Sequence, residues 1–135
     1  MLDSFGRSPL HYAALEGDLD RVRALLAEGL EVSLPDERGF TPLHSATRGG
    51  SGEVIRALVD AGAEVDAQNV FGNTPLWEAV MSTREGDGAV IRALLAARAD
   101  PECANHSGVS PRSLAETIGN YDVARHLPPR ANDQS

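Results

Sequence analysis

The chain has 135 residues, 41% of them hydrophobic, which is enough for one globular domain. Twenty acidic and twelve basic residues give a formal charge of −8, which opposes binding to nucleic acid or to an anionic membrane. This charge favours a basic partner, and it serves plain solubility equally well. The single cysteine, Cys103, excludes an intramolecular disulfide, and no signal segment or long apolar run is visible, so we expect a cytoplasmic protein.

A six-residue block recurs along the chain. It reads GRSPLH at 6–11, GFTPLH at 39–44 and GNTPLW at 72–77. The prolines stand at positions 9, 42, 75 and 111, so the spacings are 33, 33 and 36 residues. A unit of this length cannot enclose a core alone and must bury a face on its neighbours. Because a stack of such units presents an extended surface, the period favours binding of another macromolecule.

A short helix is predicted to open each unit. Serine or threonine precedes each proline, as in Ser8-Pro9, and a hydroxyl followed by proline is typical of a helix start. We expect helices over 9–16, 42–48 and 75–82, and a fourth start at Pro111. Small residues recur inside them, which lets neighbouring helices approach closely: Ala13, Ala46 and Ala79.

A second helix in each unit is predicted from apolar residues at i, i+3 and i+4. These residues are Val22, Leu25 and Leu26, then Ile55, Leu58 and Val59, then Ile91, Leu94 and Leu95. Gly29 and Gly62 follow the first two helices, and Arg98 stands in the corresponding place after the third. A side chain there costs about 1 kcal/mol, so we expect this third helix end to be the least well formed. Polar, glycine-bearing segments at 36–39, 68–72 and 105–108 predict projecting turns.

The unit resembles the ankyrin repeat, because proline, glycine, alanine and the aliphatic stripe recur in phase over residues 3–127. The resemblance implies an all-α solenoid of helix-turn-helix units with projecting β-turn loops. It implies one domain over 1–127, with repeats at about 3–35, 36–68, 69–104 and 105–127, and we expect 128–135 to be a disordered tail.

The third and fourth units depart from this pattern. The third has Trp77 in place of histidine and about three extra residues within 83–88. The fourth has Arg112 and Ser113 where leucine and histidine are expected, which suits a terminal unit whose outer face meets water.

No catalytic, metal or cofactor site is expected. The resemblance implies that His11 and His44 bond the neighbouring Ser8 and Thr41 hydroxyls, and the histidines and Cys103 lie in different repeats, without the close set that zinc requires. Cys103 and His106 lack an orienting third group. The segment 85–88 lacks the GK[ST] ending of a phosphate loop. An enzyme is therefore disfavoured.

The three phenylalanines each lie within one residue of a turn glycine: Phe5, Phe40 and Phe71. Aromatic residues are enriched in binding hot spots, and three at one repeat spacing would form a stripe along the turn edge. Alternatively, they staple one turn to the next. Trp77 is open in the same way, because it either fills space between repeats or anchors a ligand.

In ankyrin proteins, the partner usually meets the concave side, formed by turn tips and the ends of the first helices. By position, the resemblance implicates Ser4, Phe5, Arg7, Leu15 and Glu16; Glu37, Arg38, Phe40 and Arg48; and Val70, Phe71, Asn73, Met81 and Ser82, with Trp77 as a further candidate. We therefore expect a monomeric protein-interaction module that acts as a scaffold, regulator or inhibitor. A narrower alternative is a bacterial immunity protein that neutralises a basic toxin, supported by small size and acidity.

Overall fold

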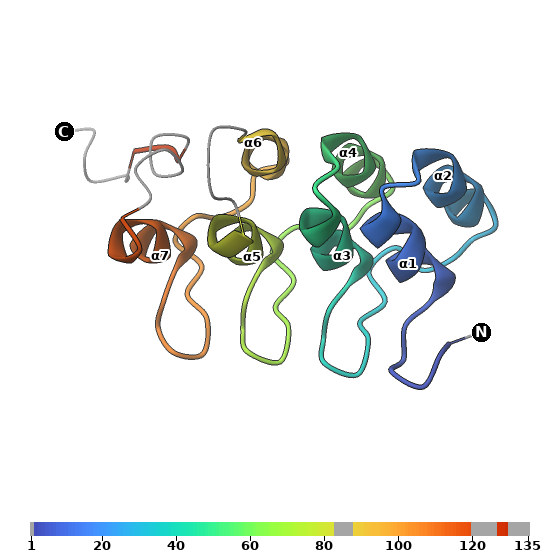
Figure 1. Ribbon diagram of the computed structural model, residues 1–135, viewed down its shortest axis with the longest axis horizontal. Helices are drawn as coiled ribbons and strands as arrows, with labels where there is room; N and C mark the ends of the chain where they lie inside the picture. The colour runs from blue at the N-terminus through green and yellow to red at the C-terminus, as the bar shows by residue number, and fades with distance from the viewer. Residues whose placement is uncertain (1, 83–87, 120–126, 130–135) are drawn as a thin grey trace.

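The computed structural model describes residues 2–82, 88–119 and 127–129. These residues contain seven helices: α1 (Pro9–Glu16), α2 (Leu19–Ala27), α3 (Pro42–Gly49), α4 (Gly52–Asp60), α5 (Pro75–Ser82), α6 (Ala89–Ala96) and α7 (Pro111–Thr117). The first helices α1, α3, α5 and α7 form one row, and α2, α4 and α6 form a second row beside it (Figure 1). No strand occurs in the described segments, and the predicted all-α solenoid is confirmed.

The helix starts follow from the hydroxyl-proline pairs. Proline takes the first helical position, where its missing N–H has no intrahelical partner, and the preceding hydroxyl accepts a backbone N–H. Thr41 Oγ1 accepts from the N–H of His44 at 3.4 Å, and Ser110 Oγ accepts from that of Ser113 at 3.1 Å. The predicted bounds of α1 and α5 are confirmed, while α3 continues one residue beyond Arg48.

The core lies between the two rows of helices. The central residues of the predicted stripe are fully buried, namely Val22, Ile55, Leu58, Ile91 and Leu94. The other four stripe residues are partly buried against this core. Gly49 permits the close packing of α1 and α3, because a Cβ at this position would lie 2.4 Å from the carbonyl oxygen of Leu15.

The ends of the second helices correct one expectation. Gly29, Gly62 and Arg98 all adopt the left-handed conformation, with φ values of 90°, 96° and 69°. The end of α6 nevertheless has the same closing bonds as that of α4, with Arg98 N–H to Leu95 at 2.9 Å matching Gly62 N–H to Val59 at 2.9 Å. The prediction of a poorly formed end was therefore wrong. The side chain affects the energy of this conformation and leaves its geometry intact.

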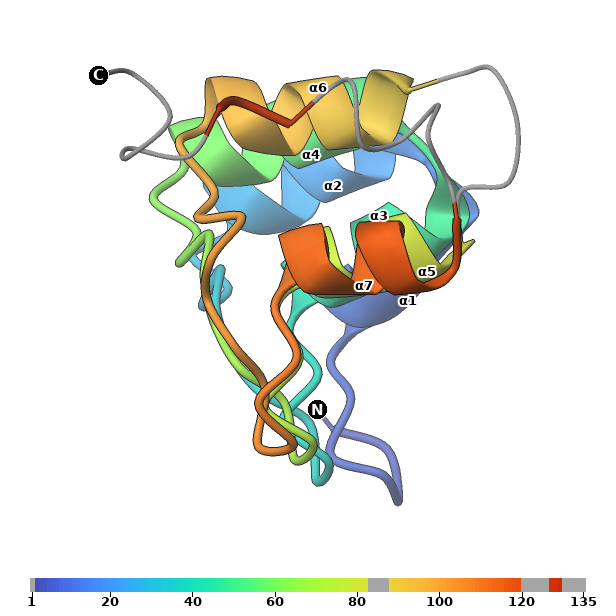
Figure 2. The same ribbon diagram turned by 90° about the vertical axis from the view of Figure 1, so that its left-hand side faces the viewer.

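The turns project from the row of first helices, and in the view along the stack the last three turns overlap while the first lies beside them (Figure 2). One backbone hydrogen bond joins each turn to the next: Glu37 N–H to Phe5 O at 2.9 Å, Val70 N–H to Arg38 O at 2.7 Å, and His106 N–H to Phe71 O at 3.1 Å. Gly72 allows the last contact, since a Cβ there would lie 2.6 Å from the His106 nitrogen. Residues 83–87 of the predicted insertion at 83–88, and residues 130–135 of the predicted tail at 128–135, lie outside the described residues.

Candidate protein-binding face

Most of the exposed large apolar side chains lie at the turn tips or at the ends of the first helices. The described residues include seven of them: Leu2, Phe5, Leu15, Val70, Phe71, Met81 and Ile118. Five were predicted from the family resemblance as partner-binding residues, and Leu2 lies elsewhere. We call the surface formed by the turn tips and the ends of the first helices the concave face. Ile118 also belongs to this face, because it follows its head proline by seven residues, as Ser82 does. Aligning the fourth unit with the third could have found it.

The head histidines are structural. Each Nδ1 accepts the backbone N–H of the residue before its proline, at 3.0 Å from Ser8 and 3.1 Å from Thr41. The expected hydroxyl contacts are present at 3.1 and 3.0 Å. Because Nδ1 accepts, Nε2 carries the proton and donates to the next repeat, to Phe40 O from His11 and to Asn73 O from His44, both at 2.9 Å. Burial lowers the pKa of His44 to about 4, so this ring is neutral at pH 7.

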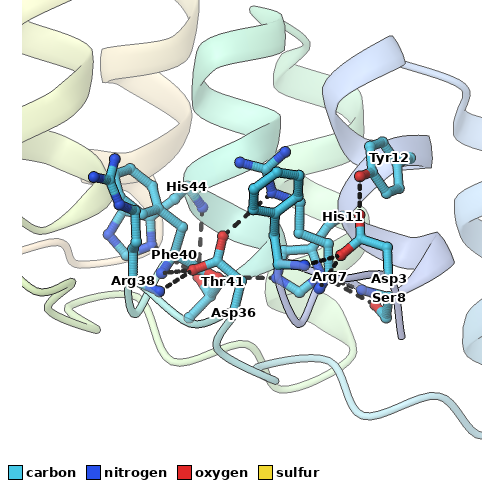
Figure 3. Close-up of polar contacts among 11 residues, drawn as sticks. Asp3, Arg7, Ser8, His11, Tyr12, Asp36, Arg38, Phe40, Thr41 and His44 are labelled. Carbon is cyan, nitrogen blue, oxygen red and sulfur yellow. Dashed lines mark hydrogen bonds and ion pairs between the residues drawn. The ribbon is translucent and has the colours of Figure 1, made fainter. Parts of the chain in front are cut away.

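Asp36 organises the junction between the first two turns (Figure 3). Its Oδ1 accepts the backbone N–H groups of Arg38 at 2.8 Å and Phe40 at 2.9 Å, while Oδ2 accepts Nε of Arg7 at 3.4 Å. Asp3 holds the first turn in the same way, and its carboxylate also accepts the hydroxyl of Tyr12. The bond from Tyr12, with the backbone N–H groups, lowers the pKa of Asp3.

A cavity of about 130 Å³ opens on the concave face between the first two repeats. It is lined by the turn residues Arg7, Asp36, Arg38 and Phe40 and by the first-helix residues His11, Tyr12, Leu15, His44, Ser45 and Arg48. Five of these ten were predicted as partner-binding residues. Tyr12, Asp36 and Ser45 were not predicted as partner-binding residues, because a single repeat does not show that side chains from adjacent units share one cavity.

The phenylalanines do not form one stripe. Phe5 and Phe71 precede their turn glycines and are exposed by 57% and 52%. Phe40 follows its glycine, so it occupies the position of Arg7 and Asn73 in the other repeats. Its half-buried ring packs edge-on against His44 at 5.4 Å, and the Arg48 guanidinium lies over it at 5.8 Å. Of the two alternatives, a single stripe of three equivalent aromatic residues does not fit these different environments.

Asn73 is a second correction. It is 6% exposed, and its side chain bonds within the protein, with Nδ2 donating to Glu78 and Oδ1 accepting from Asn105, both at 2.9 Å. It therefore links repeats three and four rather than presenting an amide to a partner. Trp77 is partly buried against the core, and its Nε1 has no hydrogen-bond partner within the described part of the chain. This burial favours the space-filling alternative.

The other predicted contact residues are open to solvent. The exposed set comprises Ser4, Glu16, Glu37, Arg38, Arg48 and Ser82, while Arg7 is half-buried. An aromatic and apolar patch with charged residues beside it is the composition of protein interfaces.

Three further features of the described segments concern metal binding, the Cys103 thiol and membrane crossing. They contain no group of three or more His, Cys, Asp or Glu residues able to hold a metal ion. Burial raises the pKa of the Cys103 thiol, with Asp66 and Asp100 acting in the same direction, so the reactive thiolate is disfavoured. Within the same segments, no helix is long and apolar enough to cross a bilayer.

Comparison with known proteins identifies the architecture. A family model for ankyrin repeats in three copies matches residues 1–69, and a single ankyrin-repeat model matches 71–106. The chain belongs to the ankyrin repeat family, whose members generally serve as protein–protein interaction modules. A search of curated proteins found no match. Both family matches end before Ser110-Pro111, where α7 begins with the same cap as the earlier heads.

Proposed function

We propose that this protein binds another protein through its concave face and acts as a scaffold, regulator or inhibitor. The observation that carries the proposal is the clustering of exposed apolar side chains at the turn tips and first-helix ends. Exposed apolar groups within one patch mark interaction sites, whereas isolated ones are ordinary. The backbone bonds between turns already join neighbouring repeats, which leaves the side chains of Phe5 and Phe71 available to a partner.

The immunity-protein alternative would use the same face against a toxin.

The proposed partner-binding set is Phe5, Arg7, Leu15, Glu16, Glu37, Arg38, Arg48, Val70, Phe71, Met81, Ser82 and Ile118. Asn73 and Trp77 are left out because the first is buried and the second packs partly buried against the core. Phe40 is also left out of the set, because its ring supports the Arg48 guanidinium.

Affinity capture from the native host with matched variants tests the proposal. Phe71→Ser with Met81→Ser removes two exposed apolar groups from the concave face. Leu2→Ser is the control, because Leu2 is 51% exposed and lines a separate hollow with Pro9, Leu25 and Leu30. We expect a specific protein to be retained by the parent and by Leu2→Ser, and to bind the double variant at least tenfold more weakly. Equal retention by all three proteins would contradict the proposal.

A further inference from the structure

The concave face differs chemically from one repeat junction to the next. Three positions contribute side chains: the one after the turn glycine, the one before the next turn glycine, and the one near the end of the next first helix. Between repeats one and two these positions hold Arg7, Arg38 and Arg48. Between repeats two and three they hold Phe40, Phe71 and Met81. A basic junction therefore adjoins an apolar one.

Two of the three arginines at the basic junction have no acidic partner in the described segments. Among the described residues, Asp36 is the only acidic one that lines the cavity, and both its carboxylate oxygens accept internal bonds. Arg7 pairs with it, whereas the described residues offer no ion pair to Arg38 or Arg48. The neutral His44 adds no charge. Asp3 and Glu37 stand nearby on the first two turns, and the Asp3 carboxylate is held by Tyr12.

This local charge opposes that of the whole chain. The formal net charge is −8, yet the cavity lining holds three arginines against one aspartate. Two guanidinium groups that line one cavity beside an apolar wall can recognise a carboxylate or a phosphate. The wall is formed by Phe40 and by Leu15, which can cover the methylene stem of a side chain. That combination fits an acidic side chain better than a bare phosphate ion.

We propose that the cavity between repeats one and two receives an aspartate or glutamate side chain of the partner, bound by Arg38 and Arg48, while apolar partner side chains pack on Phe71 and Met81. This inference rests on the proposed function and sets its specificity. A partner that is basic overall can still bind, provided that it presents an acidic residue next to apolar ones.

Selection of binders from a random twelve-residue peptide library tests the inference. Selected peptides are assigned to the concave face by shifts in the backbone amide resonances of residues 5–16 and 37–48. Arg38→Gln with Arg48→Gln is compared with Arg23→Gln plus Arg56→Gln, which removes equal charge from exposed positions on α2 and α4. An unchanged urea midpoint verifies that each variant is folded.

We expect concave-face peptides to be enriched in acidic residues. Their affinity should fall about tenfold or more for the Arg38/Arg48 variant and less than twofold for the control. Concave-face peptides without acidic enrichment, or equal losses in both variants, would overturn the inference and leave the proposed function standing. Selection of no concave-face peptide would count against both. Binding more than tenfold tighter after replacing the acidic residue with phosphoserine would reassign the cavity to phosphate.

Discussion

Corresponding residues in successive repeats take the same place at each junction but differ in chemistry. The residue after the turn glycine faces the first residue of the next turn: Arg7 pairs with Asp36 at 3.4 Å, and Asn73 bonds Asn105 at 2.9 Å. Phe40 and Asn69 occupy the corresponding positions in the middle junction. Phenylalanine offers no acceptor, and the buried Nδ2 of Asn69 has no hydrogen-bond partner in the described segments. The middle junction thus lacks the polar link that its neighbours have.

A double-mutant cycle tests this account of the middle junction. Asn69→Asp places a carboxylate oxygen where no donor faces it, so it should lower the free energy of unfolding by about 1 to 3 kcal/mol. Adding Phe40→Arg recreates the Arg7–Asp36 pair and should recover part of the loss, with a favourable coupling of about 1 kcal/mol. Urea unfolding of the parent, both single variants and the double variant gives this coupling. Zero or unfavourable coupling would contradict the register.

His44 makes stability depend on pH. Its folded-state pKa is lowered to about 4 from an ordinary value of 6.5, so the unfolded chain takes up the proton first as pH falls. Stability present above pH 6.5 is lost towards pH 4, by up to about 3 kcal/mol. His44→Gln should be modestly less stable at pH 7 and should lose less between pH 7 and 4.5, as measured by urea unfolding at both values. Parallel pH dependence of the two proteins would contradict this prediction. A chelator-dependent shift of the parent's melting temperature would contradict the purely structural role of His44.

At the scale of a helix, the second helices all end through a residue with positive φ. Arg98 is the one described non-glycine residue in that conformation, and it makes the same closing bonds as Gly29 and Gly62. Its strain is therefore energetic and can be relieved without changing the structure.

Arg98→Gly should raise the free energy of unfolding by up to about 1 kcal/mol, because glycine adopts this conformation without a Cβ penalty. Ala97→Gly provides a neighbouring control, since Ala97 has a φ of −85° and gains no such relief. Urea unfolding compares the two variants. The prediction fails if Ala97→Gly stabilises as much as Arg98→Gly, or if Arg98→Gly destabilises the protein.

Across the whole molecule, each helix packs mainly on its neighbours in the stack. Helix α4 contacts α2 on one side and α6 on the other, whereas α7 contacts α5 (Figure 1). Stability in such an array is approximately a sum of repeat and interface terms, so the middle and the end should respond differently to equal damage.

Leu58→Ala on α4 should therefore cost about 2 to 5 kcal/mol through the cavity that it leaves in the middle of the stack. Leu114→Ala on α7 should cost less, because Leu114 lies nearer the end of the stack and is 8% exposed. Urea unfolding measures both losses. Equal losses would indicate a single indivisible core rather than a linear stack.

Local sequence signals determined the repeat period, the helix starts, the buried stripe and the left-handed stops, including Arg98. Each depends on residues within one turn or one helix, where capping, proline geometry and apolar periodicity act directly. The resemblance to ankyrin repeats implied concave positions for Phe71 and Met81, and the repeat register carried that expectation from one unit to the next.

Only the tertiary structure decided what adjacent repeats do to one another. It showed that His11 and His44 donate to a carbonyl of the next unit, and that the Asn73 side chain bonds Asn105. It also showed that Phe40 packs on His44 within the second unit. It also brought three arginines around one cavity in a chain of net charge −8. The bonds of His11, His44 and Asn73 join residues about one repeat apart. A shift of a single residue around the turn glycine decides whether a side chain faces solvent or packs against the stack.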